Sequence, residues 1–193
     1  MNHRERVLAA LRHEEPDRVP LDLGGHVDST VTGTAYVRLR EHLGLGPGTT
    51  RVADIYQHTA LIEGDVRQAL DIDTLLAGDQ PVAWRGGELP DGSPALFPDR
   101  FRPETQPDGS QVVLDEEGTV VLKMPSGGHY FDPVHSPLAE ATSVADIDRH
   151  LDDIASYDRP SHLDMGYEQV GERARKLREE TDYLIVGFFG GHI

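Results

Sequence analysis

The strongest constraint on the fold is a short stretch near the amino terminus, residues 16–26, with the sequence PDRVPLDLGGH. Its centre, residues 18–23, is too short for a helix. Pro16 precedes it, Pro20 lies within it and Gly24-Gly25 follows it. Apolar residues between a proline and a glycine pair are typical of a buried strand that ends in a tight turn. The stretch therefore predicts a buried strand at residues 19–23.

A helix is expected just before this strand. Asn2 is a good helix cap and Glu5 follows three residues later, which is the capping-box pattern, and an apolar stripe follows at Val7, Leu8 and Leu11. A helix, a strand and a glycine turn are how an α/β barrel can begin, and side chains just past such a strand lie where barrel enzymes keep their chemistry. Asp22 and His26 are therefore candidate site residues. The alternative is that Asp22 caps a turn and that His26 is a solvated loop residue.

Further helices and strands alternate along the chain. Residues 72–76 and 184–189 are apolar runs that predict two more strands, the second buried on both faces. Helices are predicted at residues 34–43, at 51–70 with a break near His58, after Ser143, and from about Asp164 to Glu180. We expect these strands to form part of a parallel sheet with helices outside it. The fold class is α/β.

The block at residues 78–135 differs from the rest, because it is rich in Gly, Pro and Asp. Asp108-Gly109 separates the predicted strand runs 100–102 and 112–114, and Glu117-Gly118 separates 112–114 from 120–122, which is a hairpin signal in each case. We interpret the block as an antiparallel β insertion. His129 and Tyr130 lie in a segment that is a candidate for its substrate-facing edge, and a loop without function is the alternative.

Five segments in order resemble the uroporphyrinogen decarboxylase superfamily, closest to the branch of corrinoid-dependent methyltransferases and O-demethylases. They are RERVLAALRHEEPDRVPLDLGG at the start, then residues 54–57, 70–73, 137–140 and 183–191. The resemblance implies a TIM (β/α)8 barrel, which needs roughly 250 residues. The 193 residues are therefore expected to be one partial barrel domain, the amino-terminal portion, with its insertion at about 78–135 and its carboxyl end truncated.

The resemblance also adds site residues, because the family often carries an acid and an amide where this chain has Asp54 and Gln57. An ordinary exposed helix face is the alternative for that pair. The expected catalytic residues are Asp22, His26 and Asp54. The expected substrate-binding residues are Gly24, Gly25, Gln57, His129, Tyr130 and His192. We expect the strand-end residues among them to converge on one cleft.

Charge and composition exclude several classes of protein. The net charge is −16, from 18 basic and 34 acidic residues, which disfavours nucleic acid and anionic membranes as partners. No apolar run approaches the roughly 20 residues that a membrane span needs. There is no cysteine, hence no disulfide framework and no thiolate metal site. We assign no metal to this chain and expect it in the cytoplasm.

The resemblance leaves the reaction open. The methyltransferase branch uses a zinc held partly by cysteine and a corrinoid protein, so both are expected only for a full-length member. The decarboxylase branch, which serves porphyrin synthesis without a cofactor, resembles a cleft whose arginines follow the first strand. This chain has none at residues 23–30, which favours a methyltransferase-like member. The third alternative is a non-catalytic or split half-barrel. We expect the chain alone to be inactive on its small-molecule substrate, and to be an oligomer or to need a chain that completes the barrel.

Overall fold

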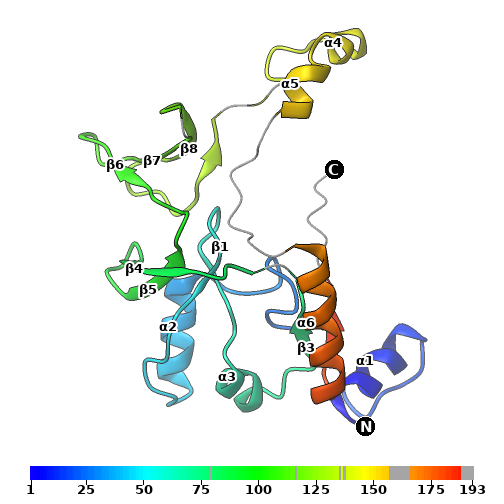
Figure 1. Ribbon diagram of the computed structural model, residues 1–193. Coiled ribbons are helices and arrows are strands. Elements are labelled where there is room, and N and C mark those ends of the chain that lie inside the picture. The colour runs from blue at the N-terminus through cyan, green and yellow to red at the C-terminus, as the bar shows by residue number, and fades with distance from the viewer. Residues whose placement is uncertain (79, 116, 135, 137, 157–165, 188–193) are drawn as a thin grey trace. The chain divides into compact units, whose positions relative to one another are not determined.

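The computed structural model describes residues 1–78, 80–115, 117–134, 136, 138–156 and 166–187. The chain divides into two units, the first formed by Met1–Asp99 with Leu163–Ile193 and the second by Arg100–His162. Both contain helices and strands (Figure 1), so the α/β class is confirmed at this coarse level. The strands among the described residues form small sheets, and no closed barrel is present among them.

The described residues of the first unit include four helices. They are α1 (His3–Leu11), α2 (Gly33–His42), α3 (Gly64–Ala69) and α6 (Tyr167–Glu180). The predicted capping box of α1 is confirmed, because Asn2 Oδ1 accepts a hydrogen bond from Glu5 N at 2.8 Å and Glu5 Oε2 accepts one from Asn2 N at 3.0 Å. None of the helices in the described ranges is long and apolar enough to cross a membrane.

The parallel strand pair of the first unit joins segments far apart in sequence. Strand β3 (Thr74–Leu76) pairs in parallel with β10 (Leu184–Val186), with Leu75 opposite Ile185. Helix α6 comes directly before β10, as the crossover to a parallel strand requires. The expected parallel pairing of the second and last strands is therefore confirmed for the described residues, which end at 187.

The strand predicted at residues 19–23 is wrong as a regular strand. Val19 is 83% exposed, and the segment runs extended beside Asp73. Asp73 N donates to Leu21 O at 2.8 Å, but Leu21 N donates to the Asp73 side chain, also at 2.8 Å, in place of a backbone carbonyl. Pro20 has no N–H to add to a ladder, so the backbone pairing stops after one bond.

The helix predicted across residues 51–70 is also wrong in its first half. Residues 51–62 contain an antiparallel hairpin of β1 (Val52–Asp54) and β2 (Thr59–Ala60), and only α3 is helical. The Asp54 side chain accepts a hydrogen bond from Gln57 N at 2.7 Å, which stabilises a turn at the expense of a helix. His58 closes the turn with φ +51°, a left-handed conformation that interrupts any helix.

The first unit also holds the hairpin of β4 (Trp84–Glu88) and β5 (Pro94–Pro98).

The main core of the first unit is a cluster that α2 and α3 form with the segments before and after α3. The fully or almost fully buried members of this cluster are Tyr36, Ala60, Ile62, Val66 and Ile72. The core therefore lies beside β3 and fixes the segments from which the site residues come.

The second unit contains a four-stranded antiparallel sheet in the order β6 (Glu104–Thr105), β7 (Gln111–Leu114), β8 (Val120–Met124) and β9 (Asp132–Pro133). Its two tight turns lie at the predicted Asp-Gly and Glu-Gly pairs, so the antiparallel prediction is confirmed here. The strand expected at residues 100–102 lies instead at β6. The helix predicted after Ser143 is present as α4 (Val144–Arg149) and α5 (Leu151–Ser156).

Candidate functional site

The predicted glycine turn after residue 23 is tied to the parallel strands by Asp22. One carboxylate oxygen of Asp22, Oδ1, accepts hydrogen bonds from Gly25 N at 2.9 Å and from the hydroxyl of Thr74, the first residue of β3. A Cβ on Gly25 would lie 2.5 Å from that same oxygen. Asp22 therefore positions the turn against β3, which is the turn-capping alternative for this residue.

His26 lies at the far end of this turn and is half-buried. Its Nδ1 accepts a hydrogen bond from Asp28 N at 3.2 Å and lies 3.4 Å from Asp28 Oδ2. Its ring is thus held within the loop at residues 26–29. His26 therefore stays a candidate site residue.

The second predicted group, Asp54 and Gln57, lies in the β1–β2 hairpin. Asp54 is 8% exposed and caps the hairpin turn through Gln57 N, while the Gln57 side chain is exposed. Next to them, His58 is 6% exposed and its ring contacts Phe97 edge-on at 5.5 Å between centroids. Burial lowers the pKa of His58 to about 4, although the nearby Asp54 carboxylate opposes the shift.

The glycine turn and this hairpin are neighbours. Backbone hydrogen bonds run from Ala60 N to Val31 O at 2.8 Å and from Gly33 N to His58 O at 2.7 Å, and Thr59 Oγ1 donates to Val27 O at 3.2 Å. These hydrogen bonds therefore hold the segment after His26 against β2 and the residue before it. The structure brings both predicted groups onto adjacent loops of the first unit.

The remaining predicted residues are not part of this arrangement. His129 and Tyr130 belong to the second unit, where both are exposed and their rings meet edge to face at 6.4 Å. His192 lies outside the described residues. In the ranges that the structure describes, no three His, Cys, Asp or Glu side chains are grouped to hold a metal ion. These residues do not supply a zinc site, so we derive no step through zinc.

A cavity of about 470 Å³ lies beside the carboxyl-terminal half of β3. Leu75 and Leu76, the last residues of that strand, form part of its wall, and so does Gly24 of the predicted turn. A Cβ on Gly24, which has φ +82°, would lie 2.5 Å from Ile62, another wall residue. The predicted glycine turn thus forms a wall of the cavity, and its glycine is needed there both for conformation and for space.

Three arginines line this cavity: Arg51 before β1, Arg67 on α3 and Arg173 on α6. Arg67 donates to Ile62 O at 2.8 Å, and its guanidinium lies 5.6 Å from the centre of the Tyr183 ring. Arg51 lies 5.9 Å from the centre of the Trp84 ring, which also lines the cavity. Burial lowers the pKa of both Arg67 and Arg173, which is the expected effect of taking a cation out of water.

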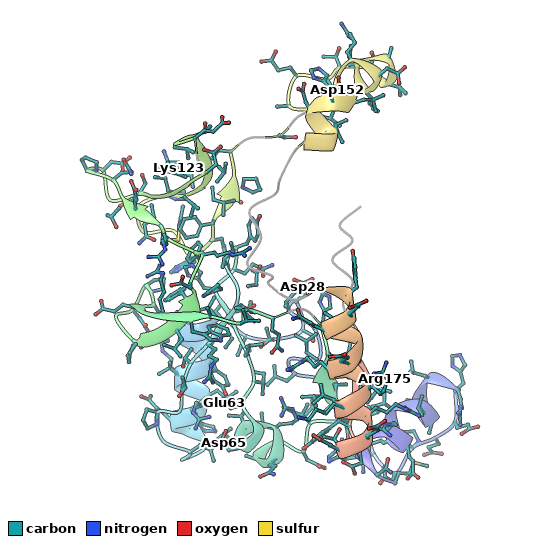
Figure 2. All side chains as sticks on the ribbon, viewed as in Figure 1. Asp28, Glu63, Asp65, Lys123, Asp152 and Arg175 are labelled. Carbon is teal, nitrogen blue, oxygen red and sulfur yellow. The ribbon has the colours of Figure 1, made fainter. Side chains whose placement is uncertain are left out.

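One carboxylate, Glu63, lies in the cavity wall, and other groups already hold it. Glu63 Oε2 accepts hydrogen bonds from Arg40 at 2.8 Å and from the Tyr36 hydroxyl at 3.3 Å, and Glu63 N donates to that same hydroxyl at 2.9 Å. Arg40 also binds Asp65. Figure 2 labels both of these carboxylates, Glu63 and Asp65. Arg40, on α2, therefore shares its one positive charge between Glu63 and Asp65.

Sequence reasoning did not find the arginine cavity. The resemblance predicts arginines directly after the first expected strand, whereas Arg51, Arg67 and Arg173 come from three separate segments. Arg67 lies one turn into α3 and Arg173 lies on a helix about a hundred residues later, so no local spacing connects them. The one available signal was that Arg173 is next to the apolar stripe of its helix.

With the geometry of the site described, the chain was compared with known proteins. Comparison with protein-family models, with curated proteins and with solved structures gave no significant match in any of the three.

Proposed function

We propose that this chain is the amino-terminal part of a barrel enzyme resembling the uroporphyrinogen decarboxylase superfamily, of the methyltransferase-like branch that acts in corrinoid-dependent methyl transfer or O-demethylation. The observation that carries the proposal is the cavity beside the carboxyl-terminal half of β3, with Gly24 of the glycine turn in its wall. Barrel enzymes bind substrate at that end of their strands. The parallel β3–β10 pair, with α6 before β10, gives further support.

In this proposal Asp22 is a positioning residue and His26 and Asp54 are the candidate proton carriers. Asp22 fixes the glycine turn on Thr74, the first residue of β3, and so holds the loop that bears His26 beside that strand. Asp54 is nearly buried and lies in the adjacent hairpin. Zinc and a corrinoid protein would come from the rest of a full-length enzyme and its partner.

The second candidate is decarboxylation of a porphyrinogen, in the branch that works without a cofactor. The three cavity arginines favour it, because decarboxylases of this superfamily hold substrate carboxylates with arginines. The absence of arginine at residues 23–30 argues against it. The two candidates differ in product, so one set of assays separates them.

The test uses the complete encoded protein. Methyl transfer from a methoxylated substrate to reduced cobalamin is followed by the absorbance change of the corrinoid, and loss of carboxylates from uroporphyrinogen III by separation of the products. Methyl transfer supports the first candidate, and four-carboxylate products support the second. Neither activity, with a folded protein, would overturn both.

A matched pair of variants makes the test specific to the site. Asp54→Asn should lower the turnover number at least about tenfold, as expected for loss of a proton-transfer group. Glu41→Gln, at an exposed acid of α2, should leave it within about twofold. Equal activity of the two variants would remove Asp54 from the site.

Interactions between chains are part of the same proposal. Within the described residues the parallel sheet has two strands, and a two-stranded sheet is marginal without further strands or covering helices. We therefore propose that the protein is an oligomer or is completed by further barrel sequence, and that it works in the cytoplasm. Sedimentation of the purified chain at several concentrations measures this directly, and a cooperative monomer would contradict it.

A further inference from the structure

We infer that the cavity formed by α3, α6 and β3 binds a small organic anion, with its acid group held by Arg67 and Arg173. The inference deepens the proposed function, on which its link to a substrate rests, by naming the class of molecule. These arginines are not at the position after the first strand where the decarboxylase branch carries its own. The site is assigned from contacts in this chain alone.

The first argument is uncompensated charge. In the described part of the chain, no carboxylate lies within ion-pair distance of Arg51, Arg67 or Arg173. The carboxylate in the wall, Glu63, is already bound by Arg40. Three cations thus share one cavity with a single carboxylate, Glu63, whose charge Arg40 already partly compensates, in a chain whose net charge is −16. An anionic ligand would remove this repulsion.

The second argument is unused hydrogen-bonding capacity. The Nε atoms of Arg67 and Arg173 are buried, and neither has a hydrogen-bond partner among the described residues. An arginine presents its donors in a planar fork that matches the two oxygens of an acid group. Leaving such donors without a partner is costly, so native structures usually satisfy them. A bound carboxylate, sulfonate or phosphate would do so.

The third argument concerns the rest of the ligand. The same wall includes the apolar side chains of Leu61, Ile62, Leu75 and Pro81, together with Trp84. Sites for small molecules combine an apolar lining with a few polar groups that fix orientation. A volume of about 470 Å³ is of the size that such molecules occupy. The ligand is therefore organic, with an apolar part besides its acid group.

The experiment measures binding without any reaction, by titration calorimetry on the complete chain. The probes are benzoate, benzenesulfonate and phenyl phosphate, with benzyl alcohol as the neutral counterpart and inorganic phosphate as the anion without an apolar part. At least one organic anion should bind in the millimolar range or tighter. It should bind at least about tenfold tighter than benzyl alcohol and than inorganic phosphate, because both the charge and the apolar part contribute.

Variants on one helix locate the site. Arg173→Gln should weaken binding of the organic anion about tenfold. Arg175→Gln removes the same charge from an exposed position of α6 (Figure 2) and should change it less than about twofold. Arg51→Gln serves as a second cavity variant if Arg173→Gln does not fold. Equal effects of the cavity and control variants, equal binding of inorganic phosphate, or no binding of any organic anion would overturn the inference.

This test can fail separately from the proposed function. An anion that binds through Arg173 to a protein without methyltransferase or decarboxylase activity leaves the site standing and removes the reaction. Turnover that Arg173→Gln does not change would remove the site and leave the reaction.

Discussion

Arg6 Nη1 donates a hydrogen bond of 2.6 Å to Oδ1 of Asp73, joining α1 to the residue immediately before β3. Asp73 is completely buried and also receives hydrogen bonds from His3, Arg18 and Leu21 N. Burial alone would raise the pKa of this carboxyl, but these donors outweigh burial and lower the pKa to about 2. The residue is thus a charged connection between the first helix and the parallel sheet.

Replacing Asp73 should strongly destabilise the folded protein. Asp73→Asn keeps the volume but removes the buried carboxylate that Arg6 and Arg18 share, and it leaves Arg6 only its pair with Asp17, so the free energy of unfolding should fall by about 3 kcal/mol. Urea denaturation followed by circular dichroism measures this. Asp71→Asn is the control, because the Asp71 side chain is 63% exposed and its pair with Arg18 should contribute less than about 1 kcal/mol. Similar losses in the two variants would contradict the role of Asp73.

His58 should make the stability depend on pH. Its pKa is about 4 in the folded chain against an ordinary value of 6.5, so the unfolded chain takes up the proton first. The contribution of neutral His58 to the free energy of unfolding is fully present above pH 6.5. The free energy of unfolding falls by up to about 3 kcal/mol as the pH falls from 6.5 towards 4. His58→Asn tolerates the left-handed backbone and removes this titration. Unfolding curves of both proteins across that range should diverge, and parallel curves would refute the prediction.

Gly25 should not accept even a methyl group. A Cβ there would lie 2.5 Å from Asp22 Oδ1 and 2.8 Å from Thr74 Oγ1, so Gly25→Ala should cost about 1–3 kcal/mol and displace the turn at the cavity wall. Gly86→Ala is the matched control, because a Cβ on Gly86 in β4 would meet nothing within 4 Å. Thermal unfolding of the two variants provides the comparison. A stable Gly25→Ala protein would mean that the turn is not held against β3.

Arg40 should control the ionisation of Asp65. The fork of Arg40 binds both Asp65 oxygens, at 2.9 and 2.7 Å, and this hydrogen bonding lowers the pKa of Asp65. In Arg40→Met that pKa should rise towards its ordinary value, and the protein should lose about 2 kcal/mol of stability. Titration of the Asp65 carboxyl by NMR measures the first effect. Arg38→Met, at an exposed position of the same helix, should leave the Asp65 titration unchanged.

Local signals in the sequence predicted much of the fold. The Asn2–Glu5 capping box and the Asp-Gly turn at residues 108–109 are present as expected, because each is decided by contacts between neighbouring residues. The helix predicted at residues 51–60 is wrong for a reason that is only partly local. Its apolar spacing fitted a helix, but the Asp54 cap and the β2 hydrogen bonds to the loop before α2 favoured a hairpin. That second set of contacts is tertiary and leaves no local pattern.

The candidate site likewise contains residues that the sequence predicted and residues that it did not. Asp22 and Gly24 were found from a turn motif, and the structure places Gly24 in the cavity wall. Arg67 and Arg173 were not found, because only the packing of α3 and α6 beside β3 brings them to one cavity. A buried charged cluster drawn from distant segments cannot be recognised from spacing along a single chain.

Arg4 has a consequence for how this protein is made. Its backbone N–H donates to Asp182 O at 2.7 Å, and its side chain donates to Thr181 O at 2.7 Å and to Tyr183 O at 3.1 Å. During synthesis α1 can therefore make these contacts only after residues 181–183 have emerged from the ribosome, whereas the sheet of residues 104–133 can pair beforehand. Proteolysis of stalled nascent chains should show protection of α1 beginning only after residue 186 has left the exit tunnel. Until then Arg4 lacks the carbonyl partners that residues 181–183 supply.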